Sequence, residues 1–570
     1  MPKFETSEKM FFGLMGRTMT NSQLEDIFPR AKAELDGHDT ANGILKIELN
    51  DTNRPDLWSA MGLTRLLKNY ENPAKTNYGF FSSADKTQDS EGRSLIIGPK
   101  AKDVRPYSVA FAADGVTVDD DILTTLIQSQ EKLCHNFGRK RKTIAMGIYR
   151  DQLIQYPVHY DGADPDKTHF IALHSDEDLS LREILEKHPK GQEYGYIIKD
   201  KPVYPLLSDD KGEILSMPPI INSARIGAVE VGDSSLFIEM SGPILKDLIL
   251  CASIMACDMA DLGYRIKPIK VVFPEETEFG KEITIPYYFQ QDAYCTLDDV
   301  EHVLGEKLSE KEVSDALLRM GIQNKVENRK VTIHCPEYRN DFLHAVDVVE
   351  DVMIGHGLEK FIPTIPKEFT VGRLTPAEEM SRKIKDIMVG LGFQEMMYNY
   401  LGSKKEYIDN MNQTQDQVKA IFIANPMTEN YEVVRPSVIP SLLESESVSQ
   451  NAVYPHRIFE VGKIAHLDSC ENSGTVTKNS LGFMLADAAA GFNDINSLVN
   501  TLMYFLRKEY RLEVPENETR FINGRCANII SDGRKIGIFG EIHPQVLENW
   551  GCAVPAVACE IDVDKLLNEQ

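Results

Sequence analysis

The sequence predicts an α+β protein built from several domains. Its 570 residues are too many for one hydrophobic core, so about three to five domains are expected. Three polar or proline-rich segments, 82–93, 273–282 and 361–376, have the composition of linkers. Strand-like and helical runs both occur between them, which predicts four blocks.

The first block contains a turn and a helix start in "NDTNRPDLWSAMGLTRLL", residues 50–67. Asp56 is placed to cap this helix, and Leu57, Met61 and Leu63 are spaced to pack against a core. By itself this segment predicts a capped helix and no chemistry.

The second block, 94–272, is mixed α+β and contains a basic cluster at 139–142. Such a cluster is usually a solvated turn, and the alternative is a contact with phosphate. Ser216, Glu239 and Ser241 are candidates to line a pocket, because the last two share one face of a predicted strand. No Ser-His-Asp or Cys-His arrangement is present here, so these residues alone favour a hydrolase only weakly.

The third block, about 284–362, is mostly helical and contains four carboxylates in one short amphipathic segment. They are Asp341, Asp347, Glu350 and Asp351. Apolar residues recur at helical spacing, at Leu343, Val346, Val349 and Met353. Three of the acids share one helix face, and the first precedes the helix, where an N-cap belongs. The simple interpretation is a solvated face with a cap. The alternative is a site that needs a cation or a basic partner.

The fourth block, 376–570, opens with a long amphipathic helix and continues with strand-like stretches such as "HRIFEVGKIAHL". No Walker lysine and no dinucleotide-binding glycine fingerprint occurs in the chain.

Composition excludes several classes of protein. The net charge of -25 argues against a generic basic nucleic-acid coat, although one local basic patch can still contact RNA. The nine cysteines form no C-x-x-C pair, which predicts reduced thiols and neither a zinc ribbon nor a disulfide framework. The N-terminus is not a signal peptide, and the longest apolar stretch, 248–257, predicts a buried helix too short to span a bilayer. We therefore expect a cytoplasmic protein with no membrane contact.

Five motifs, in this order, resemble the β subunits of phenylalanyl-tRNA synthetases. They are "TNRPDL", "QEKL…GRKRK…G", "PPIINS", "YRNDFLHAVDVVEDV…GHG" and "VVRPSVIPSLLE" with "FEVGK". The resemblance covers nearly the whole chain, which is short for the family and so looks like the archaeal/eukaryotic-type subunit. It implies an N-terminal B1-like domain at 1–85, a B3/B4 editing domain at 90–275, a B5 domain at 284–364, and an inactive class II synthetase-like core at 370–570.

For the third block the resemblance implies a helical, winged-helix-like B5 domain with a Mg2+ site shared with the α subunit. The matching acids are Asp341, Asp347, Glu350 and Asp351. Asp351 stands where Glu is usual and has a shorter reach. Because Mg2+ normally takes only one or two carboxylates, some of the four are expected to lie outside direct contact. Arg339 is placed to relieve part of the negative charge instead.

For the second block the resemblance implies hydrolysis of mischarged Tyr-tRNA(Phe). The matching pocket residues are Leu207, Ser216, Glu239 and Ser241, of which the last two are usually Asp and Thr in archaeal members. A binding site discriminates poorly against an analogue that merely adds a hydroxyl, so a second sieve improves selection. A buried acceptor such as Glu239 would hold the tyrosine hydroxyl and reject phenylalanine, which would leave the acceptor unpaired.

For the fourth block the resemblance implies an antiparallel class II core without its ATP-gripping groups. Ile458 stands where an Arg is usual, and "VACEIDVDKLL" has neither glycine nor arginine. We expect this domain to pack against the α subunit through residues 435–444. The α subunit would supply the site for phenylalanine and for ATP, a substrate of the holoenzyme, within an (αβ)2 heterotetramer that charges tRNA(Phe). The alternatives are a scaffold subunit without editing and a free-standing aminoacyl-tRNA editing hydrolase.

Overall fold

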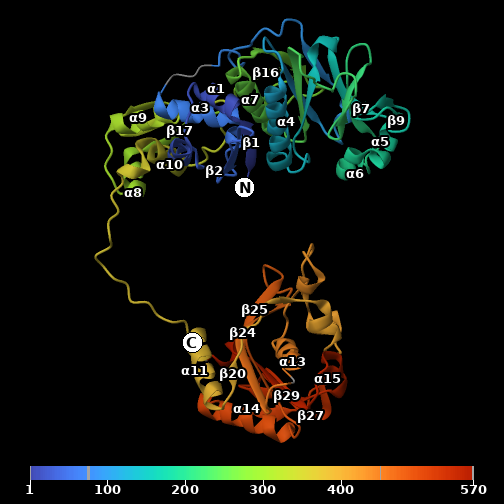
Figure 1. The fold of residues 1–570 in the computed structure, drawn as a ribbon, viewed down its shortest axis with the longest axis vertical. Coiled ribbons are helices and arrows are strands. Elements are labelled where there is room, and N and C mark those ends of the chain that lie inside the picture. Colours follow the sequence, from blue (N-terminus) through green and yellow to red (C-terminus); the bar gives the residue numbers. More distant parts are fainter. Residues whose placement is uncertain (1, 74–77, 450, 568–570) are drawn as a thin grey trace. The chain divides into compact units, whose positions relative to one another are not determined.

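A computed structural model describes residues 2–73, 78–449 and 451–567. The chain forms two compact units, Met1–Thr364 and Ile365–Gln570 (Figure 1). The division between them falls inside the proline-rich segment 361–376. Each unit has hydrophobic clusters of its own, so each is described by itself.

The first unit begins with a small antiparallel sheet in the order β1-β3-β2. Its elements are β1 (Lys3–Ser7), α1 (Glu8–Met15), α2 (Asn21–Ile27), β2 (Ala33–Asp39), β3 (Ile44–Leu49) and α3 (Ala60–Glu71). The N-cap of α3 is Ser59, whose hydroxyl accepts from the Gly62 amide. The prediction that Asp56 caps this helix is wrong, because Asp56 is buried in the preceding 3-10 turn and paired with Arg54 at 2.8 Å.

Two sheets form the middle of the first unit, a seven-stranded sheet β12-β11-β10-β7-β4-β15-β16 and a four-stranded sheet β14-β5-β13-β6. The strands of the larger sheet are β4 (Ser94–Ile97), β7 (Val158–Ala163), β10 (Tyr204–Ser208), β11 (Ile214–Met217), β12 (Ile221–Asn222), β15 (Ile269–Val272) and β16 (Glu282–Ile285). Those of the smaller sheet are β5 (Tyr107–Asp114), β6 (Ala145–Arg150), β13 (Ser235–Gly242) and β14 (Arg265–Lys267). Nearly every residue of β5, β6 and β13 is buried, as expected for strands covered on both faces.

Helices cover these sheets, and a small helical subdomain extends from them (Figure 1). They are α4 (Asp120–Lys132), α5 (Leu181–Lys187), α6 (Pro189–Tyr194) and α7 (Leu245–Asp261), with a short hairpin of β8 (His169–Ile171) and β9 (Asp178–Ser180). Every residue of 248–257 on α7 is buried, which confirms the predicted buried helix. Packing all round requires apolar residues on every face of a helix, and this stretch supplies them.

The first unit ends with three helices and an antiparallel sheet in the order β17-β19-β18. The elements are β17 (Ala293–Thr296), α8 (Leu297–Leu304), α9 (Glu310–Arg319), β18 (Gln323–Glu327), β19 (Lys330–His334) and α10 (Ala345–His356). The predicted helix exists, but it begins only after His344, so Leu343 is 75% exposed and Val346 is 53% exposed. Val348, Val349 and Val352 form its buried face, and of these three the predicted apolar set contained Val349.

The second unit is built on a seven-stranded sheet in the order β20-β24-β25-β29-β28-β27-β26, antiparallel except at its β20 edge. The strands are β20 (Gln394–Glu395), β24 (His456–Leu467), β25 (Thr475–Ala486), β26 (Arg511–Glu513), β27 (Phe521–Ser531), β28 (Arg534–Ile542) and β29 (Ala556–Asp562). The covering helices are α11 (Pro376–Gly390), α13 (Ile439–Val448), α14 (Phe492–Leu506) and α15 (Pro544–Trp550). The helices α11 and α14 share one apolar cluster with the sheet, and α13 and α15 share another, so both faces are covered.

A small sheet in the order β21-β23-β22 and a short helix complete the second unit. They are β21 (Leu401–Gly402), α12 (Gln415–Val418), β22 (Ile421–Phe422) and β23 (Val433–Val434). The predicted α+β multidomain class is confirmed. In the described part of the chain, no helix is long and apolar enough to cross a membrane.

Candidate functional site

A cavity of about 570 Å³ lies in the first unit between α4, β6, β13 and the loops around β11 and β12. Of the four pocket residues predicted from the sequence, Ser216 on β11 and Glu239 on β13 line it. Leu207 and Ser241 are fully buried and do not line it. The structure therefore brings two of the four side chains to the cavity and places the other two behind its wall.

Glu239 is the one acid that β13 contributes to this cavity. Its side chain is 1% exposed, and Oε1 accepts a hydrogen bond from the Ser108 hydroxyl at 2.6 Å. Burial raises the pKa of Glu239 to about 7, against the opposing effects of the Ser108 hydrogen bond and the Arg105 charge. A carboxyl with this pKa is present in both protonation states near neutral pH, so it can accept a hydrogen bond or donate one.

The glycine opposite Glu239 on the neighbouring strand leaves room for the Tyr149 side chain. Gly147 on β6 lies directly opposite Glu239, and a Cβ at Gly147 would stand 2.0 Å from Oη of Tyr149. Tyr149 in turn donates to Oγ of Ser216 at 2.8 Å. This bond fixes the Ser216 hydroxyl at the cavity wall, where its own hydrogen is free to point to a ligand.

The remaining two predicted residues support this wall from behind. Ser241 accepts from Nε of Arg105 at 3.1 Å, and its carbonyl oxygen accepts from Nη2 of the same arginine. Leu207 on β10 lies directly opposite Ser216 on β11 in the antiparallel register. Neither side chain is placed to touch a ligand in this cavity.

Arg141, from the basic cluster 139–142, forms part of the same wall. The sequence alone predicted that the cluster is a surface turn or contacts phosphate. Arg139, Lys140 and Arg141 all have left-handed backbone angles, with φ of 49°, 55° and 65°. Three consecutive non-glycine residues in this region are costly, and such strain concentrates at functional sites. Arg141 lines the cavity and donates to the carbonyl oxygen of Ile220 at 2.8 Å. The run of four basic letters was the signal that could have found it.

Three of the four acids of the third block, Asp341, Glu350 and Asp351, line one small pocket, and Asp347 does not. Basic side chains line the same pocket, and each of the three acids is paired with one of them. Asp341 and Asp351 both bind the buried Arg339, at 2.9 Å from its Nε and at 2.7 Å from its Nη2 respectively. Nε of Arg54 lies 3.9 Å from Asp341. Burial raises the pKa of Asp341, but the Arg339 and Arg54 charges outweigh it and hold that pKa well below its usual range. Burial raises the pKa of Asp351, with Arg339 opposing.

The other two acids have partners other than this arginine pair. Glu350 accepts from Nζ of Lys32 at 2.5 Å. Asp347 accepts from the amides of Leu343 and His344 at 2.7 and 2.6 Å, which makes it the acid that caps α10. Asp341, predicted as the cap, is not the cap.

The fit of these acids to Mg2+ follows from those contacts. Within the described ranges, no group of three or more His, Cys, Asp or Glu side chains is placed to hold a metal ion. Arginine, lysine and backbone amides already occupy the carboxylate oxygens that an octahedral ion would need. As arranged here, the four acids do not fit a single Mg2+.

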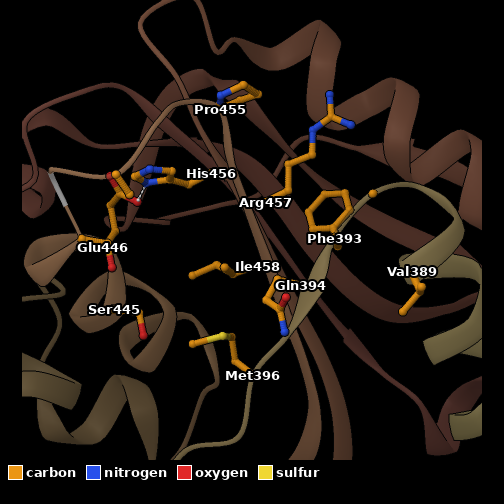
Figure 2. Close-up of a pocket in the computed structure, with 13 residues that line it drawn as sticks. Val389, Phe393, Gln394, Met396, Ser445, Glu446, Pro455, His456, Arg457 and Ile458 are labelled. Atoms are coloured by element: carbon orange, nitrogen blue, oxygen red, sulfur yellow. Dashed lines mark hydrogen bonds and ion pairs between the residues drawn. The ribbon is translucent and has the colours of Figure 1, made fainter.

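The second unit has its own cavity of about 430 Å³, between β20, β24 and the end of α13 (Figure 2). Figure 2 shows Glu446 against His456 at one side of it, where Nδ1 of the histidine lies 2.7 Å from the carboxylate. Ile458 and Gln394 face the middle of the same cavity. An isoleucine there offers no charge to a phosphate.

The two charged residues of the "VVRP" and "FEVGK" motifs bind one another. Nη1 and Nη2 of Arg435 donate to the Glu460 carboxylate, at 2.7 and 3.0 Å, and Nε donates to the Lys463 carbonyl. Arg435 is completely buried, and so are the side chains of Leu442 and Leu443. Residues 435–443 are buried within this chain and Glu444 is exposed, because α13 packs this segment onto the sheet. Packing against the α subunit through residues 435–444 stays a prediction.

Comparison with known families agrees with the motif order. Residues 294–358 match the tRNA synthetase B5 domain, and residues 362–563 match the phenylalanyl tRNA synthetase beta chain CLM domain. Together these matches cover the end of the first unit and nearly all of the second.

Similar proteins extend the match to the full chain. A phenylalanine--tRNA ligase beta subunit of Borrelia hermsii is 46% identical over 569 residues, covering 100% of both chains. That of Borreliella burgdorferi strain ZS7 is 46% identical over 571 residues, again covering 100% of both. A crystal structure of an N-terminal fragment of the phenylalanyl-tRNA synthetase beta subunit from Pyrococcus horikoshii matches with a TM-score of 0.58 and 35% identity. That match covers 62% of this chain and 100% of the fragment. This chain belongs to the family of phenylalanine--tRNA ligase beta subunits.

Proposed function

We propose that the first-unit cavity hydrolyses Tyr-tRNA(Phe) while the chain supports aminoacylation of tRNA(Phe) by an α subunit. The observation that carries the editing role is Glu239, a buried carboxyl that lines the cavity. It accepts from the Ser108 hydroxyl, and among the described residues it forms no ion pair, although the Arg105 charge acts on it. A buried acceptor without a cation needs a hydrogen-bond donor. The phenolic hydroxyl of a tyrosyl ester supplies one, and phenylalanine does not.

The reaction itself is an ester hydrolysis. A water molecule attacks the ester carbonyl, the bond to the ribose oxygen breaks, and that oxygen takes up a proton. Ser216, held by Tyr149, is placed to orient the ester or the water. His174 and His188 also line the cavity, and both ring nitrogens of His188 are engaged, by the Leu173 carbonyl and the Lys190 amide. Glu239 is assigned to the tyrosyl hydroxyl, so we assign activation of the water to the neighbouring ribose hydroxyl of the substrate.

The test is deacylation of Tyr-tRNA(Phe) by the αβ complex, with Phe-tRNA(Phe) as the control substrate. Glu239→Ala should lower kcat/KM by about one to two decades, because a lost hydrogen bond to a charged group costs roughly 1.5–3 kcal/mol. Ser241→Ala is the comparison variant: Ser241 hydrogen-bonds Glu239 from behind the wall, so its loss should lower kcat/KM less than the loss of Glu239 itself. Equal rates for wild type and Glu239→Ala would remove Glu239 from the role. No deacylation by wild type would favour the scaffold alternative.

We further propose that the second unit is catalytically inactive and structural. Ile458 replaces a cationic partner of ATP, and Arg435 is fully engaged by Glu460. Phenylalanine and ATP would then be bound by the α subunit, within an (αβ)2 heterotetramer in the cytoplasm. Pyrophosphate exchange that depends on phenylalanine should be absent from the isolated chain and appear when the α subunit is added. Exchange by the chain alone would overturn this proposal and favour an independent enzyme.

The subunit type and the domain limits are also proposals. One observation supports the archaeal/eukaryotic-type short form: the Pyrococcus horikoshii fragment matches over 100% of its own length and 62% of this chain. The relatives that match over the whole chain come from Borrelia hermsii and Borreliella burgdorferi. The limits 1–85, 90–275, 284–364 and 370–570 stay predictions. So does Mg2+ at the four acids, which in the arrangement described would first have to release their basic partners.

A further inference from the structure

We infer that the first unit holds a second ligand site, beside the proposed editing cavity, which binds a nucleotide of the single-stranded RNA whose 3′ end enters that cavity. This inference rests on the proposed editing function. The site is a separate cavity of about 490 Å³, lined by Pro2, Thr52, Trp58, Asn136, Phe137, Arg139, Thr143, Ile244 and Asp247. Its volume lies within the roughly 300–1,000 Å³ typical of small-molecule sites.

The basic cluster 139–142 connects the two cavities. Arg141 lines the first cavity, where the carbonyls of 219 and 220 and the ring of Tyr194 hold its guanidinium. Arg139, two residues earlier, lines the second. The left-handed backbone angles at 139–141 direct these two side chains to different cavities. A π-helical turn, Leu133–Phe137, comes just before them. Both irregularities are costly features that concentrate at functional sites.

A buried polar group without a partner lines the second cavity. The indole Nε1 of Trp58 is buried and has no hydrogen-bond acceptor among the described residues, although the side chain is only 4% exposed. The side chains of Asn136 and Arg139 are exposed at this cavity, and half-buried Asp247 interacts electrostatically with Arg139. The N-cap of α7, Ile244, also lies here and gives the first amides of the helix no side-chain acceptor. A buried donor without an acceptor is costly, so the Trp58 indole is a donor available to a ligand.

The chemistry of these groups fits a nucleotide. Arg139 and the uncapped amides of α7 suit a phosphate, since a helix N-terminus and a cation both favour negative charge. Phe137 offers an aromatic ring beside them, the usual platform for an unstacked base. Asp247 lies near the Arg139 charge and would repel a phosphate placed against its own carboxylate, so it faces another part of the nucleotide. A carboxylate accepts well from the amino group of cytosine, whereas uracil presents an acceptor at that position.

The experiment uses the two tryptophans of the chain, Trp58 and Trp550. In a Trp550→Phe background the fluorescence reports on Trp58 alone. The full-length chain is titrated with an RNA hairpin that carries a short single-stranded 3′ tail of cytidines, and with the same hairpin carrying uridines. We expect the cytidine tail to change Trp58 fluorescence with saturation, and a hairpin without a tail to have no such effect.

Two variants and one matched control locate the site. Arg139→Gln should weaken tail binding about tenfold, as for loss of one charge-assisted contact. Lys140→Gln removes the same charge one residue away, from a side chain that lines neither cavity, and should weaken binding much less. Asp247→Asn should abolish most of the preference for cytidine over uridine, expected to be about tenfold in the parent.

Equal losses for Arg139→Gln and Lys140→Gln would overturn the inference, because they would indicate general electrostatic attraction. An unchanged Trp58 signal with every tail would also overturn it. Deacylation of Tyr-tRNA(Phe) measured in parallel separates this failure from that of the editing proposal. Deacylation without tail binding would leave editing in place and remove the second site. Tail binding without deacylation would support the RNA site and overturn editing.

Discussion

Two buried glutamates, one in each unit, have opposite surroundings. Glu239 is 1% exposed and Glu460 is 3% exposed, and each sits within an antiparallel sheet. Glu460 accepts hydrogen bonds from Nη1 and Nη2 of Arg435. Glu239 has the Ser108 hydroxyl as its partner and an open cavity beside it. A buried carboxylate that forms an ion pair has its charge balanced within the protein. A buried carboxylate that forms no ion pair and lies beside a cavity remains available to a ligand.

Removing the cation of the complete pair should have the largest effect. Arg435→Leu leaves Glu460 buried and unpaired, which should destabilise the chain by roughly 3–5 kcal/mol. The double variant Arg435→Leu with Glu460→Leu should recover much of that loss, because no charge is then stranded. Urea unfolding followed by circular dichroism measures both. A single variant as stable as wild type would contradict the contrast between the two glutamates.

The pH dependence of stability should identify Glu239 as the carboxyl without a cation. Its folded pKa is raised to about 7 from 4.5, so the folded state holds the proton more tightly than the unfolded chain. Stability contributed by Glu239 is then unchanged below about pH 4.5 and falls as pH rises to about 7, by roughly 3 kcal/mol in total. Glu239→Gln, which cannot ionise, should lose this fall. The measurement is the unfolding free energy of both proteins from pH 4.5 to 8, and parallel curves would contradict the prediction.

Asp347 tests a carboxylate whose partners are amides. Asp347→Ala removes the acceptor for the Leu343 and His344 amides at the start of α10, and should cost about 1 kcal/mol. Asp347→Asn keeps an acceptor and should cost less. Unfolding by urea compares the two. If both variants cost the same, the cap is not what Asp347 contributes.

The smallest effect is expected at Glu350. Its partner Lys32 is partly exposed, as is Glu350 itself, so Glu350→Gln should change stability by about 0.5 kcal/mol or less. The Mg2+ prediction gives a different result for assembly: the double variant Asp347→Asn with Glu350→Gln would then weaken the complex or its dependence on Mg2+. Analytical ultracentrifugation over a Mg2+ series distinguishes the two. Identical assembly at every concentration would leave these acids as a helix cap and a surface ion pair.

Local patterns in the sequence were sufficient for some of these features. Residues 248–257 are apolar on every side, so their burial as a helix followed from composition alone. The helix of the third block followed from its spacing, but its start and its buried face did not, because the capping by Asp347 shifted the first turn to Ala345. Likewise Asp56 was expected as a cap and is instead a partner of Arg54.

The sequence by itself determined the α+β class, the family motifs and the presence of a carboxyl and a hydroxyl, Glu239 and Ser216, for one cavity. Only the tertiary structure decided which carboxyls meet a cation. Arg54 lies beside Asp341 and Lys32 beside Glu350, although each pair is separated by most of the first unit in sequence. Periodicity reports which face of an element a residue occupies, but not which distant element packs against that face. The charge state and availability of a buried acid depend on that packing partner.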